Sequence, residues 1–172
     1  GEFHPDPVEA AKFVKKLGAD SITIHLREDR RHINDKDAKK ICSIKKIPVN
    51  LEISTNAKIV KIALKIKPNF ICIVPENRKE ITTEGGLNLK KNKIQIKKII
   101  SKFKKKNIRT SLFVNPSLDD IKISKQLGAD CVEIHTGRLA NLVKSNRYYL
   151  NEYKRIKKCS ILANNLSIEV HA

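Results

Sequence analysis

Several features are scarce in this sequence, and each scarcity argues against a class of protein. Aromatic residues make up 5% of the 172 residues and tryptophan does not occur, so the chain offers few stacking platforms for single-stranded nucleic acid. No apolar run approaches the ~20 residues that a membrane-spanning helix needs. The start, GEFHPDPVEA, lacks the basic and apolar regions of a signal peptide. We therefore expect a cytoplasmic protein without a membrane partner.

Cysteine spacing argues against a zinc site. The four cysteines, at positions 42, 72, 131 and 159, never form CxxC or another spacing typical of zinc ligands. Cys72 lies in FICIV and Cys131 in DCVEI, where each is best interpreted as a small hydrophobic residue of a buried strand. We expect no metal and no redox role.

Positive charge is abundant, with a formal net charge of +18. Such a charge suits nucleic acid, an anionic membrane surface or phosphorylated metabolites. Many lysines lie in KKNKIQIKKIISKFKKKN, whose apolar residues Ile94, Ile96, Ile99, Ile100 and Phe103 could form one helical stripe. The lysines would then be the solvated face of a helix, and we favour this interpretation over an RNA-binding surface.

Composition and length fit one soluble domain, with 40% hydrophobic and 31% charged residues. PDPVEAAKFVKKLGAD predicts a helix that Asp6 caps, that has Pro7 in its first turn and that ends at Gly18. Helix and strand patterns then alternate along the chain. The predicted strands are residues 21–25, 48–53, 69–74, 109–114, 131–135 and the final SIEVHA.

This alternation predicts a parallel sheet covered by helices, either a TIM (β/α)8 barrel or a doubly wound sheet. The segment KKLGADSITIHLRE at 15–28 recurs as KQLGADCVEIHTGR at 125–138, and no GxGxxG motif occurs. Polar residues follow successive strands, as in the active site of a TIM barrel. They are His25, Arg27, Glu52, Glu76, Glu133, His135 and His171. Since a barrel has eight strands, we predict a single α/β-barrel domain over 1–172 that is truncated at both ends.

The densest polar segment is HLREDRRHIND at 25–35. Its arginines could bind phosphate bidentately, and its histidines titrate near neutrality. Glu28 and Asp29 could equally form exposed ion pairs with those arginines. Spacing alone leaves both interpretations open.

Two carboxylates follow apolar neighbours in the strands. Burial of Glu52 in VNLEIS would raise its pKa and make it a usable base, whereas a strand-end glutamate can also simply reach solvent. Alternation places Glu133 and His135 on the same strand face as Cys131. If that face points inward, a functional role is favoured, because burying ionisable groups is costly.

The segment VPENRKEITTEGGL is long for a loop between strand and helix. Its two glycines, Gly85 and Gly86, could supply hinge freedom and exposed amides, and Thr82 and Thr83 could donate to a phosphorylated ligand. A lid over the site is one interpretation, and an unstructured insertion is the other.

The stretches HLREDRRHI, NLE, VPE, TTEGGL, SLF and EIHTG, in this order, resemble the pyridoxine 5'-phosphate synthase family, with matches from PDPVEAA to the terminal VHA. The resemblance implies a TIM barrel that condenses 1-deoxy-D-xylulose 5-phosphate with 3-amino-2-oxopropyl phosphate to pyridoxine 5'-phosphate, inorganic phosphate and water. It also implies transferase chemistry, no metal or organic cofactor, and a homo-octamer built from dimers.

By the same resemblance, His25 matches an active-site histidine, Glu52 the principal general base, and Glu133 a glutamate that supports the transition state. The positions that match contacts to the deoxyxylulose phosphate are Arg27, His32 and Thr82.

The chain departs from the family at its ends. Family members begin with a strand carrying an Asn, Asp and His cluster followed by a phosphate-binding arginine, and continue into a Gly-His-Gly motif with a second catalytic histidine. His171 stands where many relatives have asparagine, so no catalytic role is transferred to it. We expect the isolated chain to be inactive or impaired.

Two alternatives remain at this point. One is a basic RNA-binding or scaffolding protein on a decayed barrel, although the charged residues at the strand ends argue against decay. The other is a barrel enzyme that acts on different sugar phosphates, which would share the phosphate-binding groups but not the full set of motifs.

Overall fold

A computed structural model describes residues 6–76 and 85–172 of the chain. Its centre is a six-stranded sheet in which every neighbouring pair is parallel and the strands lie in sequence order, β1-β2-β3-β4-β5-β6. The strands are β1 (Ile22–His25), β2 (Val49–Ile53), β3 (Phe70–Ile73), β4 (Arg109–Val114), β5 (Cys131–Ile134) and β6 (Glu169–His171). All six predicted strands are therefore confirmed.

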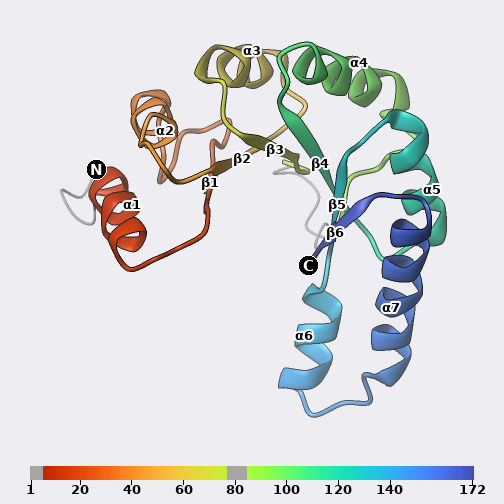
Figure 1. Cartoon of the computed structure of the whole chain (residues 1–172). Coiled ribbons are helices and arrows are strands. Elements are labelled where there is room, and N and C mark those ends of the chain that lie inside the picture. The colour runs from red at the N-terminus through yellow and green to blue at the C-terminus, as the bar shows by residue number, and fades with distance from the viewer. Residues whose placement is uncertain (1–5, 77–84) are drawn as a thin grey trace.

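Helices connect the strands and lie outside the curved sheet (Figure 1). They are α1 (Pro7–Lys16), α2 (Asp35–Cys42), α3 (Ala57–Ile66), α4 (Lys93–Lys104), α5 (Leu118–Leu127), α6 (Gly137–Lys144) and α7 (Leu150–Asn165). Consecutive parallel strands need such crossovers, since each strand must restart at the same end of the sheet. The predicted α/β fold is confirmed.

The helix boundaries follow local chemistry. Asp6 caps α1 by accepting hydrogen bonds from the amides of Val8 and Glu9, and Pro7 occupies the first turn. The cap of α2 is Asn34, which forms a capping box with Asp37. Gly18 follows α1 with a φ of +91°, a conformation that glycine adopts without steric cost.

The expected apolar stripe of α4 is confirmed except at one position. Ile96, Ile99, Ile100 and Phe103 are buried, whereas Ile94 is 74% exposed. Residues two apart on a helix point about 200° from each other, so Ile94 lies on the solvent side when Ile96 faces the sheet. Including Ile94 in the stripe was wrong for this reason.

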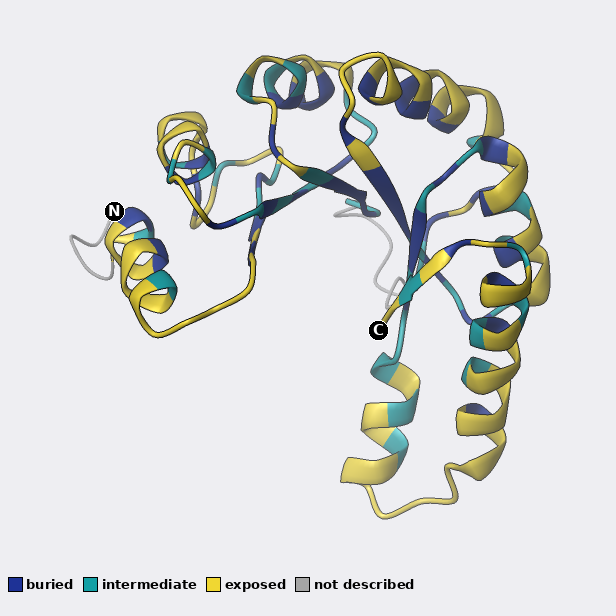
Figure 2. Ribbon diagram, in the orientation of Figure 1, coloured by how far each residue is buried: buried dark blue, intermediate teal, exposed yellow. Residues whose placement is uncertain are grey.

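The sheet curves into an open arc and does not close (Figure 1). Among the described residues, β1 and β6 are the two edges, and no pairing joins them. Side chains that face the helices form the core, which Figure 2 shows as dark blue along the strands and the inner sides of the helices. No helix of the described residues covers the other face of the sheet (Figure 1). This arrangement is that of an incomplete TIM barrel, as the strand count predicts.

The long helical region after β5 consists of two helices, α6 and α7, which run side by side away from the barrel (Figure 1). Glu152 joins them: its side chain is buried and lies 3.7 Å from Arg138 Nε of α6 and 2.7 Å from Arg155 Nη2 of α7. Within residues 6–76 and 85–172, no helix is both long and apolar enough to cross a membrane.

Candidate active site

Strand alternation places four ionisable side chains on the inner face of the sheet. In β2, Val49, Leu51 and Ile53 are fully buried toward the helices, while Glu52 is partly exposed on the opposite face. Register aligns His25 of β1 with Glu52, and Glu52 with Cys72 of β3. Glu133 of β5 reaches the same region, because Cys72 Sγ lies 3.7 Å from its Oε2. The sheet therefore gathers residues that are far apart in sequence.

His25 and Glu52 form the closest pair of this group. The Nδ1 atom of His25 lies 3.4 Å from Oε2 of Glu52, and the two side chains are 24% and 22% exposed. Burial, together with the nearby Arg27 guanidinium, lowers the pKa of His25. Burial and the nearby Glu133 carboxylate raise the pKa of Glu52. The two shifts bring the pKa values of the pair closer together, which favours proton transfer between them.

Cys72 lies between the two glutamates. Its thiol donates to Glu133 Oε2, and burial with the two carboxylates raises its pKa far above the ordinary value. The thiol is therefore protonated and unreactive. The burial expected of Cys72 and Cys131 is confirmed, but both line the inner face rather than pack under the helices.

The inner face also carries polar atoms that lack a partner. The buried atoms without a hydrogen bond in the described chain include His25 Nε2, Asn50 Oδ1 and Ser111 Oγ. A cavity of about 510 Å³ opens beside Asn50 and Ser111, and Thr23 and Glu133 also line it. Because unpaired buried polar atoms are costly, these atoms are suited to meet a polar ligand. Asn50 and Ser111 were missed from sequence, where nothing distinguishes them from other strand residues.

The loop after β1 separates its three arginines into two kinds. Arg30 Nε lies 2.6 Å from Asp35, and Arg31 Nε lies 2.8 Å from Asp29, so both form the exposed ion pairs expected of a solvated loop. Among the described residues, the acidic neighbours of Arg27 lie at 3.8 Å, and its buried Nε has no hydrogen-bond partner there. The ion-pair interpretation is thus confirmed for Arg30 and Arg31, whereas binding of an anion stays a prediction, for which Arg27 is the best suited of the three arginines.

His32 and Thr82 complete the predicted set. His32 is exposed in the same loop, with a left-handed backbone φ of 70°. Thr82, with the lid predicted around it, lies outside the described residues. Sequence reasoning had identified His25, Glu52, Glu133 and Arg27, and the fold brings these four to one end of the sheet.

The glycines after that segment have a different role from the one expected. The Gly86 amide donates to Asn115 Oδ1 at 2.8 Å, and a Cβ at Gly86 would lie 2.4 Å from the Asn115 amide nitrogen. The prediction of a free hinge with exposed amides is wrong for Gly86, because its backbone packs directly on the end of β4.

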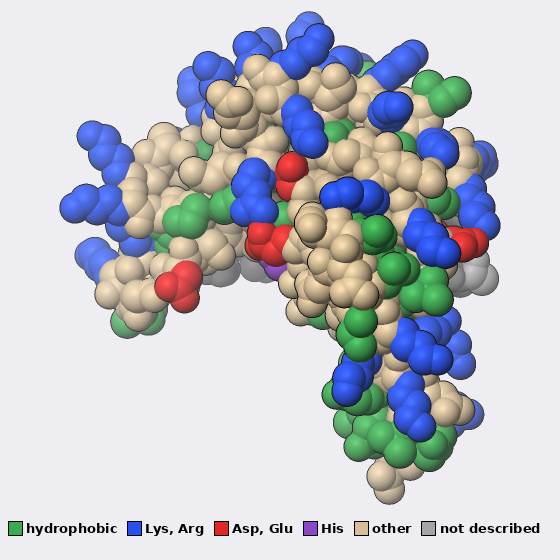
Figure 3. Space-filling model, turned by 45° about the vertical axis from the view of Figure 1, so that its right-hand side comes forward, with side chains coloured by type: hydrophobic (Ala, Val, Ile, Leu, Met, Phe, Trp, Pro, Cys, Tyr) green, Lys and Arg blue, Asp and Glu red, His purple; other side chains and the backbone are tan. Residues whose placement is uncertain are grey.

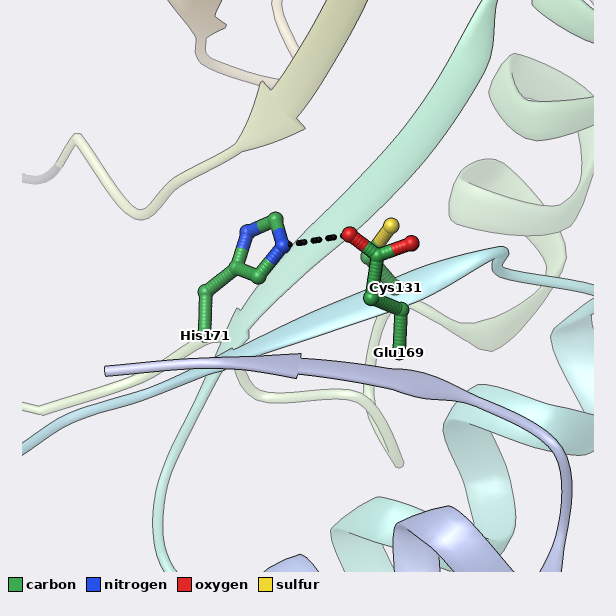
Figure 4. Close-up of side chains that lie close together, drawn as sticks. All are labelled: Cys131, Glu169 and His171. Carbon is green, nitrogen blue, oxygen red and sulfur yellow. Dashed lines mark hydrogen bonds and ion pairs between the residues drawn. The ribbon is translucent and has the colours of Figure 1, made fainter. Parts of the chain in front are cut away.

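One further cluster has the donor atoms of a metal site. Cys131, Glu169 and His171 hold one ligand atom each within 4.8 Å of one another (Figure 4). The Arg109 guanidinium, however, binds Glu169 and also reaches Cys131 Sγ, and burial raises the pKa of the Cys131 thiol to about 11. A cation would have to displace an arginine and deprotonate the thiol, so we assign no metal here.

Lysine and arginine side chains are spread widely over the surface. On the face that Figure 3 shows, they are distributed over the outer helices rather than concentrated in one patch. This distribution fits the interpretation of the lysines as solvated helix faces.

An open (β/α) barrel with a histidine–glutamate pair and an arginine at the carboxyl ends of its strands is the arrangement of an enzyme of the TIM-barrel class, with groups suited to acid–base chemistry. Comparison with known proteins identifies the family. Residues 1–172 match the family described as pyridoxal phosphate biosynthesis protein PdxJ, and the chain belongs to this family, which functions in vitamin B6 biosynthesis.

Similar proteins from three bacteria support the same family, since each is named pyridoxine 5'-phosphate synthase. The chain is 66% identical over 172 residues to the pyridoxine 5'-phosphate synthase of Pelagibacter ubique (strain HTCC1062), covering 100% of this chain and 72% of that protein. The synthase of Aquifex aeolicus (strain VF5) is 45% identical, with 99% and 71% covered. That of Hydrogenobaculum sp. (strain Y04AAS1) is 43% identical, with 99% and 72% covered.

Proposed function

We propose that this protein is a pyridoxine 5'-phosphate synthase of the transferase class. It condenses 1-deoxy-D-xylulose 5-phosphate with 3-amino-2-oxopropyl phosphate and releases pyridoxine 5'-phosphate, inorganic phosphate and water. The observation that carries the proposal is the His25–Glu52 pair at 3.4 Å, with its pKa values shifted toward each other and Arg27 beside it. Imine formation, proton transfer and phosphate loss all need such groups.

In this proposal Glu52 is the general base and His25 exchanges protons with it and with the substrate. The raised pKa of Glu52 strengthens it as a base. Glu133, held by the Cys72 thiol, stabilises positive charge that develops in the transition state. The residues that contact the deoxyxylulose phosphate are Arg27, His32 and Thr82.

The proposal also covers the cellular compartment, the cofactor requirement and the oligomeric state of the enzyme. We propose a cytoplasmic enzyme that needs no metal or organic cofactor and assembles as a homo-octamer. The α6–α7 hairpin supports self-association, because it projects from the barrel and exposes Val143, Tyr148, Tyr149 and Tyr153. Light scattering on the purified protein measures the assembly directly, and a monomeric mass across micromolar concentrations would contradict it.

The test of the activity uses the protein as its gene encodes it. The two substrates are supplied to wild type, to Glu52→Gln and to Glu9→Gln, and pyridoxine 5'-phosphate is followed with time. We expect Glu52→Gln to lower kcat by about 10²- to 10⁴-fold, the usual contribution of a general base. Glu9 is exposed in α1, and within the described residues its carboxylate pairs with Lys12 alone, so Glu9→Gln should match wild type.

The outcomes separate the candidate functions. Product from wild type and Glu9→Gln, with little from Glu52→Gln, supports the synthase. A folded wild type that makes no product would overturn it. Retention of RNA that falls with salt and ignores the substrates would instead favour the RNA-binding alternative.

A further inference from the structure

Glu76 is a buried carboxylate that has no role in the proposed reaction. It lies just after β3, its side chain is 6% exposed, and its Oε2 atom is buried without a hydrogen-bond partner. Burying a carboxylate that is only partly paired costs stability. Such a group is retained where its charge serves a neighbour, so its contacts show what it could do.

Within the described residues, the polar contacts of Glu76 are with the loop after β1. Glu76 Oε1 accepts a hydrogen bond from the Glu28 amide at 2.8 Å and lies 3.8 Å from Arg27 Nε. The first contact fixes the backbone directly after Arg27. The second places a negative charge beside the guanidinium without a close hydrogen bond, and among the described residues the Arg27 Nε has no hydrogen-bond partner, so this donor is available to a ligand.

The same loop is held at the next residue. The Glu28 carboxylate accepts from Ser54 Oγ at 2.6 Å and from Asn56 Nδ2 at 2.9 Å. Glu28 thus ties the loop to the end of β2 and the cap of α3, while Glu76 ties it to the end of β3. The two contacts fix the backbone on the carboxyl side of Arg27.

Arg27 differs from its neighbours in this respect. Arg30 and Arg31 make close ion pairs with Asp35 and Asp29. In the described part of the chain, Arg27 has two carboxylates at 3.8 Å, those of Asp29 and Glu76. Of these, Glu76 is the more deeply buried and follows a different strand, so it is the one that can set the direction of Arg27 relative to the sheet.

We propose that Glu76 is a positioning residue that orients Arg27 toward the phosphate of the substrate. The inference rests on the proposed function, since it deepens the role given there to Arg27. Glu76 touches no reacting atom. It acts by fixing the backbone that carries Arg27 and by holding the guanidinium through charge.

A double-mutant cycle tests this inference. Glu76→Ala, Arg27→Ala and the double variant are assayed for KM toward 1-deoxy-D-xylulose 5-phosphate and for kcat, with Glu9→Ala as the exposed control. We expect Glu76→Ala to raise KM about tenfold, the effect of losing one charge-assisted contact, and to change kcat less. In the Arg27→Ala background the same substitution should have almost no further effect on KM.

Glu76→Gln separates the two contacts of the side chain. Its amide oxygen can still accept from the Glu28 amide, but it lacks the charge beside Arg27. We expect KM between those of wild type and Glu76→Ala. If Glu76→Ala fails to fold, Glu76→Gln takes its place in the double-mutant cycle.

Failure of the inference and failure of the proposed function give different results. If wild type makes product and Glu76 substitutions raise KM equally with and without Arg27, only the inference is overturned. If wild type makes no product, the proposed function fails, and calorimetric titration of inorganic phosphate replaces KM in the same cycle. Phosphate affinity that is independent of Glu76 there would overturn the inference as well.

Discussion

At the scale of single residues, the ionised carboxylate of Glu52 lowers the free energy of unfolding. Burial and the Glu133 charge raise its pKa in the folded protein, so the folded state binds its proton more tightly than the unfolded chain. Ionisation of Glu52 therefore destabilises the folded state. The penalty is absent below the unfolded pKa and is complete above the folded pKa.

It follows that Glu52→Gln should stabilise the protein while removing activity. A gain of about 1 kcal/mol near neutral pH would raise Tm by ~2–4 °C in a chain of this size. The gain should disappear as pH falls through the folded pKa of Glu52 to below the unfolded pKa, where Glu52 is protonated in both states. Thermal unfolding of wild type and Glu52→Gln across pH measures it, and a lower Tm for Glu52→Gln at pH 7 would contradict the expectation.

At the scale of elements, the segment before α4 is held to the end of β4 by backbone contact. A Cβ at Gly86 would approach Asn115 N and Val114 C at 2.4 Å, whereas one at Gly85 would meet only Asn115 Oδ1 at 3.4 Å. The two neighbouring glycines differ in the room that each leaves for a Cβ atom. Alanine substitutions at the two positions therefore form a matched pair of variants.

We expect Gly86→Ala to destabilise the protein by about 1–3 kcal/mol or more, since backbone atoms of two elements must separate. Gly85→Ala should have a much smaller effect, because the Asn115 side chain can adjust. Urea unfolding of both variants gives the comparison. Equal midpoints would show that the contact between Gly86 and β4 does not matter.

At the scale of the whole molecule, the net charge of +18 sets the rate at which anionic substrates arrive. Both proposed substrates carry phosphate, and long-range attraction is screened by salt. We expect kcat/KM to fall roughly tenfold between about 20 mM and about 500 mM NaCl, with kcat at saturation unchanged. A parallel fall in kcat would indicate that salt perturbs the site itself.

Features that depend on local signals could be predicted from the sequence, and features that depend on packing across the whole molecule could not. Strand and helix positions were readable because hydrophobic periodicity, capping residues and glycines are local signals, as in the helix from Pro7 to Lys16. The burial of Ile94 was predicted wrongly, because the elements that a helix packs against decide which of its faces is buried. Thr82 lies outside the described residues, so its role stays a prediction.

The sequence by itself determined the order of strands and helices, the positions of the polar strand ends and, through its motifs, the family. Only the tertiary structure decided which side chains meet: that His25 faces Glu52, that Cys72 reaches Glu133, and that Glu76 lies beside Arg27. The reason is physical. Contacts between parallel strands depend on register and curvature, which arise from packing across the whole sheet and leave no mark in any one segment.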